Sequence, residues 1–217
     1  MKSGVLRLAA LSLVAVLALA GCGGGDDDKD NKDSKDDSSQ SSDGSSTPED
    51  DGLTDPGSAL ELGESATFKW QATAKVSGQA EVTVTRIDKA PIKAFSGFKL
   101  SDAMKKSTPY YVHLRVKNAG TSNLGGFEPP VFLDNGSSIL YPAAHISGFA
   151  PCADRLLPKK FGPNAKPASL CMVFLAPAKT ELRTVALRPD EAQEQIDWTG
   201  DVTAPGAKAK KGAKKKR

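Results

Sequence analysis

Alternating apolar and polar residues in the middle of the chain predict a series of short β-strands. In the run 110–118, the even-numbered positions from Tyr110 to Val116 are apolar, whereas the odd-numbered positions from Tyr111 to Lys117 include His113, an arginine and a lysine. This period of two predicts an antiparallel strand with one buried and one solvated face. Similar runs predict strands at residues 66–70, 79–90, 168–176, 180–187 and 196–198.

Two shorter patterns predict how these strands are connected. The run 131–141 is typical of a β-hairpin, because Asn135-Gly136 tolerates the positive φ angles that a type I′ turn requires. Residues 189–194 begin with proline and continue with acidic side chains, which predicts one short helix. Pro177 is expected to end the strand before it.

Seven or eight strands at this spacing, with little helix, predict an all-β protein built as an immunoglobulin-like β-sandwich. The chain has no glycine-rich phosphate loop, no alternation of strands with helices and no internal repeat. The fold class follows from the pattern, but the strand order does not.

The first 21 residues have the composition of a secretory signal peptide. Lys2 and Arg7 precede an apolar run that is too short to span a bilayer as a mature helix. Leu19-Ala20-Gly21-Cys22 resembles the lipobox of bacterial lipoproteins, in which the cysteine is acylated and becomes the new N-terminus. The resemblance implies lipid on Cys22 and a location on the extracytoplasmic face of the cell membrane; a cleaved signal without lipid is the alternative.

Charge divides the remaining chain into three blocks. Residues 22–57 form an acidic Asp/Ser-rich linker, with 12 acidic residues and 3 lysines between Gly23 and Gly57. Residues 58–202 are long enough for one domain. Residues 203–217 end in a tail with seven basic residues and no acidic residue. Both flanking blocks lack the apolar content of a folded core, so we expect them to be disordered.

The cysteine count agrees with export. With Cys22 assigned to lipid, Cys152 and Cys171 form an even pair, and a disulfide between them would persist in an oxidising compartment. Two buried thiols, or a metal pair without further ligands, are the alternatives.

No pattern in the sequence predicts catalysis, a cofactor or a metal site. His113 is expected on a solvent-exposed strand face and His145 in a loop, and neither has partners at metal-ligand spacing. No Gly-x-Ser-x-Gly elbow accompanies them, so we expect a protein that is not an enzyme.

The basic tail is the polar feature most suggestive of binding. Clustered cations attract polyanions without reading sequence, and the tail has no aromatic residue for base stacking, which argues against specific nucleic-acid recognition. Anionic envelope polymers, lipid headgroups or the chain's own acidic linker are the expected targets; a solubilising tail is the alternative. Its charged residues are Lys208, Lys210, Lys211, Lys214, Lys215, Lys216 and Arg217.

The strand 110–118, continued by Ala119-Gly120, resembles the signature of telokin-like, immunoglobulin-fold domains on Gram-positive, including actinobacterial, lipoproteins. The following hairpin at 132–136, the apolar strand before Pro177 and the end at Ile196-Asp197-Trp198 are similar to later elements of that family, which is related to a mycobacterial immunoprotective secreted antigen. The resemblance covers residues 62–200. It implies an immunoglobulin-like sandwich on an exported protein and no shared activity, ligand or catalytic residue.

Together these observations predict a lipid-anchored, non-catalytic module that contacts an envelope polymer or an envelope protein. One alternative is a solute-binding or enzymatic domain with its site in the loops 94–106 and 145–160. Another is an accessory role in assembling a neighbouring envelope complex. The insert 94–106 is expected either to carry function or to form a local helix that covers a sheet edge.

Overall fold

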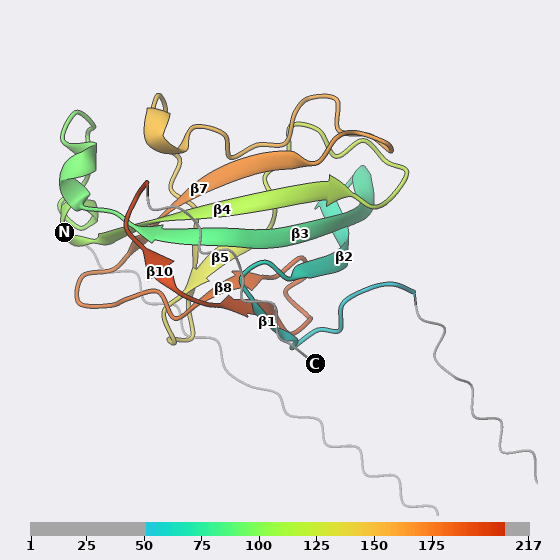
Figure 1. Ribbon diagram of the computed structural model, residues 1–217, viewed down its shortest axis with the longest axis horizontal. Coiled ribbons are helices and arrows are strands. Elements are labelled where there is room, and N and C mark those ends of the chain that lie inside the picture. Colours follow the sequence, from blue (N-terminus) through green and yellow to red (C-terminus); the bar gives the residue numbers. More distant parts are fainter. Residues whose placement is uncertain (1–50, 207–217) are drawn as a thin grey trace, which may run out of the picture. The chain divides into compact units, whose positions relative to one another are not determined.

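The computed structural model describes residues 51–206, so the leader, nearly all of the acidic linker and the basic tail lie outside it. Ten strands in the described part of the chain form two sheets packed face to face (Figure 1). The predicted all-β sandwich is confirmed. No helix among residues 51–206 is long and apolar enough to cross a membrane.

Sheet A has five strands in the order β1-β9-β8-β5-β6. All neighbouring strands are antiparallel except β1, which runs parallel to β9. The bounds are β1 Ala59–Glu61, β5 Val131–Asp134, β6 Leu140–Pro142, β8 Thr184–Leu187 and β9 Ile196–Thr199.

Sheet B is built on β3, its longest strand. One edge of β3 pairs with β4, which pairs in turn with β7; the other edge pairs with β2 along its first part and with β10, in parallel, near its end. The bounds are β2 Ser65–Thr73, β3 Val76–Lys89, β4 Thr108–Asn118, β7 Ala168–Ala176 and β10 Val202–Thr203.

The main core lies between the sheets, where the inward side chains of both meet. Sheet B contributes Val84, Leu114 and Phe174, and sheet A contributes Leu133 and Trp198, all at most 2 % exposed. The Trp198 indole nitrogen donates a hydrogen bond to the Glu64 carbonyl oxygen, so the largest core side chain leaves no unpaired polar atom.

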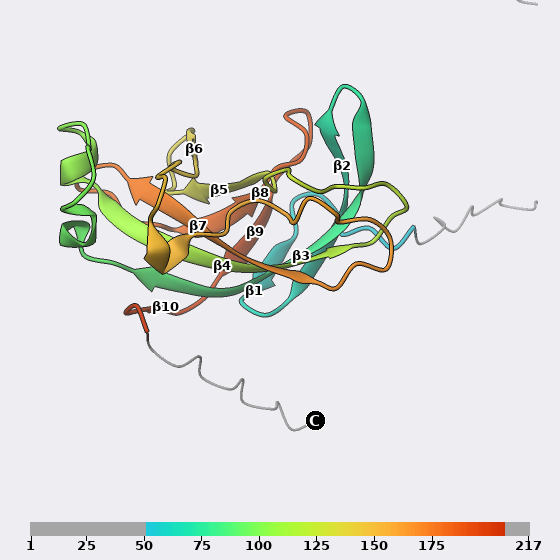
Figure 2. The same ribbon diagram turned by 90° about the horizontal axis from the view of Figure 1, so that it is seen from above.

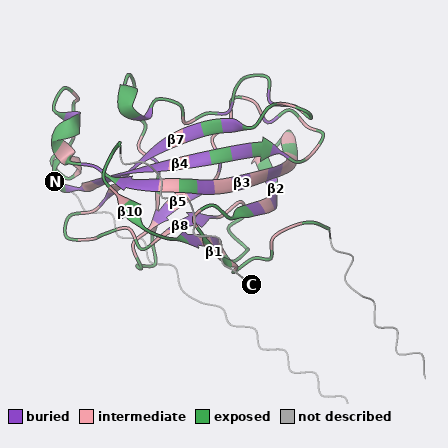
Figure 3. Cartoon of the chain, in the orientation of Figure 1, coloured by how far each residue is buried: buried purple, intermediate pink, exposed green. Residues whose placement is uncertain are grey.

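The outer face of sheet B, which points away from sheet A, is only partly solvated. Tyr111, predicted on a wet face, is 4 % exposed because a second apolar cluster covers it. Figure 3 shows β4 buried almost continuously near its start and alternating with exposed residues toward its end. The alternation in the sequence therefore describes only the second half of the strand.

The second cluster is formed by segments from two connections. The insert between β3 and β4 contains two 3-10 turns, η1 Ile92–Phe95 and η2 Met104–Lys106, and the segment before β7 contains a third, η3 Ala150–Cys152. Phe95 and Phe149 stack at 4.3 Å between ring centroids. The insert thus covers a face of sheet B with 3-10 turns, whereas the sequence analysis expected a local helix over a sheet edge as one alternative. The buried members of the second cluster are Ala90, Phe95, Tyr111, Phe149, Cys152 and Val173.

The predicted hairpin at 131–141 is present, but the two-residue turn predicted for it is not. The last strand pair is Asp134 with Leu140, which leaves a five-residue loop. Gly136 has a positive φ of 83°, whereas Asn135 does not. The side chains of Asp134 and Asn135 accept hydrogen bonds from the amides two residues ahead, and these local Asx turns replace the tight turn.

Two other local predictions are also wrong. Residues 189–194 form turns and no helix, because the Asp190 carboxylate accepts the Ala192 amide in an Asx turn. The strand expected at 180–187 begins only at Thr184, since the Thr180 amide and hydroxyl both bond to the Pro177 carbonyl oxygen in a turn.

The parallel edge strands β1 and β10 were not predicted. Each has only two or three residues, too few for a sequence period to appear. Residues 51–57, at the end of the acidic linker, also contact the sandwich: the Thr54 amide donates to the Thr67 carbonyl oxygen on the free edge of β2.

Candidate functional site

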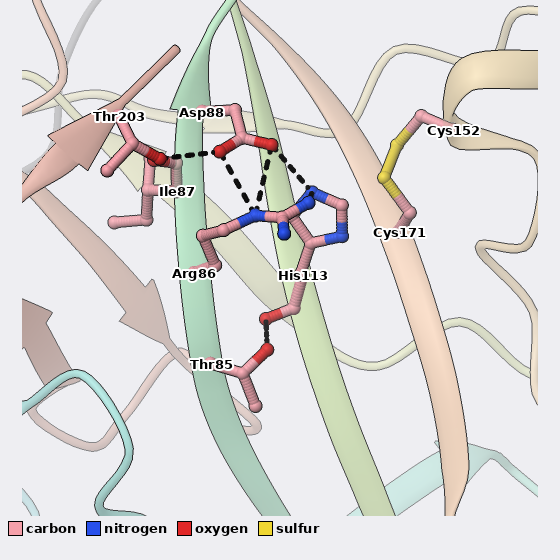
Figure 4. A network of polar contacts seen from close by, with 8 residues as sticks. All are labelled: Thr85, Arg86, Ile87, Asp88, His113, Cys152, Cys171 and Thr203. Atoms are coloured by element: carbon pink, nitrogen blue, oxygen red, sulfur yellow. Dashed lines mark hydrogen bonds and ion pairs between the residues drawn. A yellow bond between two sulfur atoms is a disulfide. The ribbon is translucent and has the colours of Figure 1, made fainter. Parts of the chain in front are cut away.

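A polar network on the outer face of sheet B is centred on the Asp88 carboxylate. A β-bulge at Thr85 shifts the register between β3 and β4, so that Arg86 lies opposite His113. Arg86 and Asp88, two residues apart, therefore lie on the same face as the imidazole (Figure 4). Bulges of this kind re-aim side chains, and they are frequent beside functional sites.

Asp88 is 1 % exposed and accepts hydrogen bonds from three side chains. Arg86 Nε donates to it over 3.0 Å, and Thr203 Oγ1 of β10 donates to Oδ1 over 2.7 Å. His113 Nε2 lies 3.0 Å from Oδ2. This buried carboxylate is therefore paired with a cation and hydrogen-bonded on both oxygens, as burial of a charge requires.

The chemistry that the network supports is limited. With its proton on Nε2, the His113 ring donates to Asp88, and Arg86 Nη2, 2.9 Å from the same nitrogen, is a neighbouring donor. An Asp–His pair is also part of a hydrolase triad, but within residues 51–206 no hydroxyl or thiol nucleophile bonds to the ring. The network instead attaches β10 to the sheet.

The network and the second cluster meet at Tyr111. Burial raises the pKa of the Tyr111 hydroxyl above its ordinary value, and the nearby Asp88 carboxylate raises it further. The phenol is therefore neutral at physiological pH, as its position against Phe95 and Phe149 requires.

The predicted disulfide between Cys152 and Cys171 is confirmed. Cys171 lies on β7 directly opposite His113 on β4, so the bond fixes the segment before β7 beside the polar network (Figure 4). The same segment covers the free edge of β7: the Cys171 amide donates to the Asp154 carbonyl oxygen, and the Ala144 amide to that of Val173.

A cavity of about 330 Å³ lies beside the disulfide, inside one of the two loop regions expected to hold an alternative site. His145, Ser147 and Arg155 provide its polar lining. His145 Nε2 lies 3.1 Å from a Glu128 carboxylate oxygen, which also accepts from Arg155. The predicted loop 145–160 thus lines a polar cavity. Glu128 does not line it but contacts two of its lining residues, and the sequence pattern did not indicate this contact.

The network formed by Asp88 and Arg86 was not predicted from the sequence, although the spacing of these two residues indicated it. Opposite charges at Arg86 and Asp88, two residues apart in a strand, must share one face. His113 was predicted on a solvent-exposed face, but the structure places it in this half-buried network. Cys22 and the basic residues of the tail lie outside the described residues. No group of three or more His, Cys, Asp or Glu side chains within residues 51–206 has the arrangement of a metal site.

We expect replacement of Asp88 with alanine to lower the free energy of unfolding by about 2 kcal/mol, because Arg86, His113 and Thr203 lose their shared acceptor. Arg86 and His113 are partly exposed and rehydrate, which keeps the loss below that of a fully buried pair. Urea unfolding measures the change. Asp154→Ala, at an exposed aspartate, is the control; equal midpoints for both variants would contradict the role of Asp88.

Comparison with known proteins gives no match among family models, curated proteins or solved structures.

Proposed function

We propose that this protein is a lipid-anchored extracytoplasmic module, in which an immunoglobulin-like sandwich contacts an anionic envelope polymer or an envelope protein with help from the basic tail. The observation that carries the proposal is the disulfide between Cys152 and Cys171. Structural disulfides persist in oxidising compartments and are rare in the cytosol, so the bond supports export.

The disulfide also bears on the role of Cys22. The chain has three cysteines, and pairing two of them leaves Cys22 as the only remaining thiol. That cysteine directly follows Leu19-Ala20-Gly21 at the end of a signal-like run. Acylation there would explain both its position and the absence of a partner cysteine elsewhere in the sequence.

The tail supports the binding part of the proposal. Deleting residues 207–217 removes seven positive charges, and we expect it to weaken attachment to envelope material at least tenfold at low salt, with little change in unfolding midpoint. Co-sedimentation of the non-acylated chain 22–217, which has no lipid to hold it on membranes, with isolated envelope fractions across a salt series measures the effect. Equal retention with and without the tail at low salt would show that the tail is passive.

A second candidate function is capture of a small solute, which the cavity beside the disulfide favours. A volume of about 330 Å³ with His145, Ser147 and Arg155 as its polar lining suits a small polar molecule. Thermal-shift measurements with a panel of small sugars, amino acids and amines test this candidate. Stabilisation that disappears when Ser147→Phe fills the cavity would support it, and no stabilisation by any member of the panel would count against it.

A further inference from the structure

A groove of about 1080 Å³ lies at one end of the sandwich. The end of β2 and the start of β3 form one part of its lining, and the loop after β4 and the turn after β8 form the rest. Figure 2 shows the β2–β3 hairpin standing out at the end where this loop and this turn also lie. The volume is just above the range of about 300–1,000 Å³ typical of pockets for drug-sized ligands, so the groove suits a short oligomer. We call it the end groove; its lining residues are 69–71, 77–79, 119–122, 189–191 and 193.

Asn118, at the end of β4, fixes the loop that forms one wall of the end groove. The side chain is 8 % exposed; its oxygen accepts a hydrogen bond from the Gly120 amide, and its nitrogen donates to the Ser122 carbonyl oxygen. The Ala119 amide donates to the Gln79 carbonyl oxygen on β3. A Cβ at Gly120 would lie 2.9 Å from the Gln79 backbone nitrogen, so the close approach requires glycine. This wall is therefore in place before a ligand binds, which lowers the entropic cost of binding.

Trp70 provides an unpaired hydrogen-bond donor at the end groove. The side chain is 5 % exposed and packs edge-on to Phe127, but its indole nitrogen donates to no residue in the described part of the chain. Among residues 51–206, the one enclosed side-chain polar atom without a partner is Arg188 Nε, so the Trp70 nitrogen still reaches solvent. The end groove is the space that Trp70 lines. A buried indole N–H usually has a partner, and a ligand oxygen in the groove would supply one.

Hydroxyl and amide side chains give the end groove most of its remaining polar lining. Within residues 51–206, the side chains of Ser77, Gln79, Thr121 and Gln193 make no hydrogen bond. Each of these side chains can both donate and accept. The exposed Glu191 carboxylate, which has no ion pair in the same part of the chain, adds an acceptor. Groups that donate and accept match the hydroxyls of a sugar, because each sugar hydroxyl also does both.

The charge and the apolar content of the lining argue against two other classes of ligand. The end groove has two carboxylates, Asp190 and Glu191, and a single lysine, Lys69, which pairs with Asp51 at 3.5 Å. This balance disfavours a polyanion. None of the described residues that line the groove is a leucine, isoleucine, valine, methionine or phenylalanine, so a peptide would find few apolar contacts for its side chains. An uncharged, hydroxyl-rich ligand fits both observations.

We propose that the end groove binds an uncharged oligosaccharide. The inference goes beyond the proposed function, because this site needs neither the lipid nor the basic tail and takes an uncharged ligand. Sugar hydroxyls bond to Gln79, Glu191 and Gln193, and the Trp70 indole N–H donates to a sugar oxygen. Because no charge on the ligand is neutralised, binding is nearly independent of salt, unlike attachment through the tail.

Isothermal titration of the non-acylated chain 22–217 with maltohexaose, mannohexaose and chitohexaose, at low and high salt, tests the inference. The groove variant combines Ser77→Ala with Glu191→Ala. Its matched control combines Ser169→Ala with Glu61→Ala, at a serine and a glutamate that are also exposed but lie outside the end groove. Urea unfolding of both variants shows whether the substitutions change stability.

We expect at least one of the three hexasaccharides to bind, with the same affinity at both salt concentrations. The groove variant should bind it about tenfold more weakly than the control, because one hydrogen bond to a charged group and one to a neutral group are lost. The urea midpoints of the two variants should be equal. Absence of binding by all three hexasaccharides at millimolar concentration would overturn the inference, and so would equal binding by the groove variant and its control.

Poly-L-lysine is the probe for the competing class of ligand, an extended cationic peptide. If it bound in a way that required Glu191 while no hexasaccharide bound, the end groove would be a peptide site and the inference would be wrong. None of these results bears on attachment through the tail, since deletion of residues 207–217 tests that separately.

Discussion

Replacing Cys22 with alanine is expected to move the protein from the membrane fraction to the soluble fraction. Each buried methylene of an acyl chain contributes about 0.8 kcal/mol to membrane attachment, and two or three chains hold a protein durably where a single chain is marginal. With no lipid, only the salt-sensitive attraction of the tail would remain. The expected change is therefore nearly complete after a high-salt wash.

Fractionation of cells with a high-salt wash and a detergent step measures this change. Gly23→Ala, one residue after the proposed lipid site, is the matched control and should remain with the membrane. If Cys22→Ala still needs detergent for release, the lipid assignment is wrong, and the apolar run before it would have to anchor the chain.

Removing the disulfide has the second-largest expected effect. The bond joins residues 19 positions apart, and closing a loop of that length contributes about 3 kcal/mol in the chain-entropy model. Cys152 also packs in the second cluster, so loss of the bond frees the segment that carries Phe149. The double variant with alanine at both positions should therefore unfold at a lower urea concentration, by about 3 kcal/mol in free energy.

Two further measurements separate the effect of the covalent bond on stability from the effect of side-chain packing. Ser169→Ala, at an exposed position on β7, should change stability by less than about 0.5 kcal/mol. Reduction of the wild-type protein with dithiothreitol breaks the bond but keeps both side chains, so it should give most of the loss seen in the double variant. A reduced protein with an unchanged urea midpoint would show that packing alone fixes the segment before β7.

The part of the fold that follows a regular sequence period was predictable. Strand β7 has the predicted bounds, and the apolar residues of β4 at Leu114 and Val116 lie in the core as expected. These positions obey one rule, that alternate side chains on a strand face the same layer. The disulfide was predicted for a different reason, namely an even number of cysteines besides Cys22 in a chain whose sequence predicts an export signal.

The remaining features depend on contacts between distant segments. Tyr111 is buried because Phe95 and Phe149, which come from two other connections, cover it. Asp88 becomes the centre of a network only when the bulge at Thr85 and the short strand β10 are in place. A local sequence pattern carries no information about either contact. The alternation in β4 therefore predicted a solvent-exposed face where the structure has a second small core.

Intact mass spectrometry of the protein purified from its own membranes tests most directly whether the mature protein is a lipid-anchored, oxidised module. Under non-reducing conditions we predict a chain that begins at Cys22, carries a diacylglyceryl group there and lacks two hydrogens relative to the reduced form because of the Cys152–Cys171 bond. A mass that corresponds to the unmodified chain from Met1, with free thiols, would contradict both the lipid anchor and the disulfide.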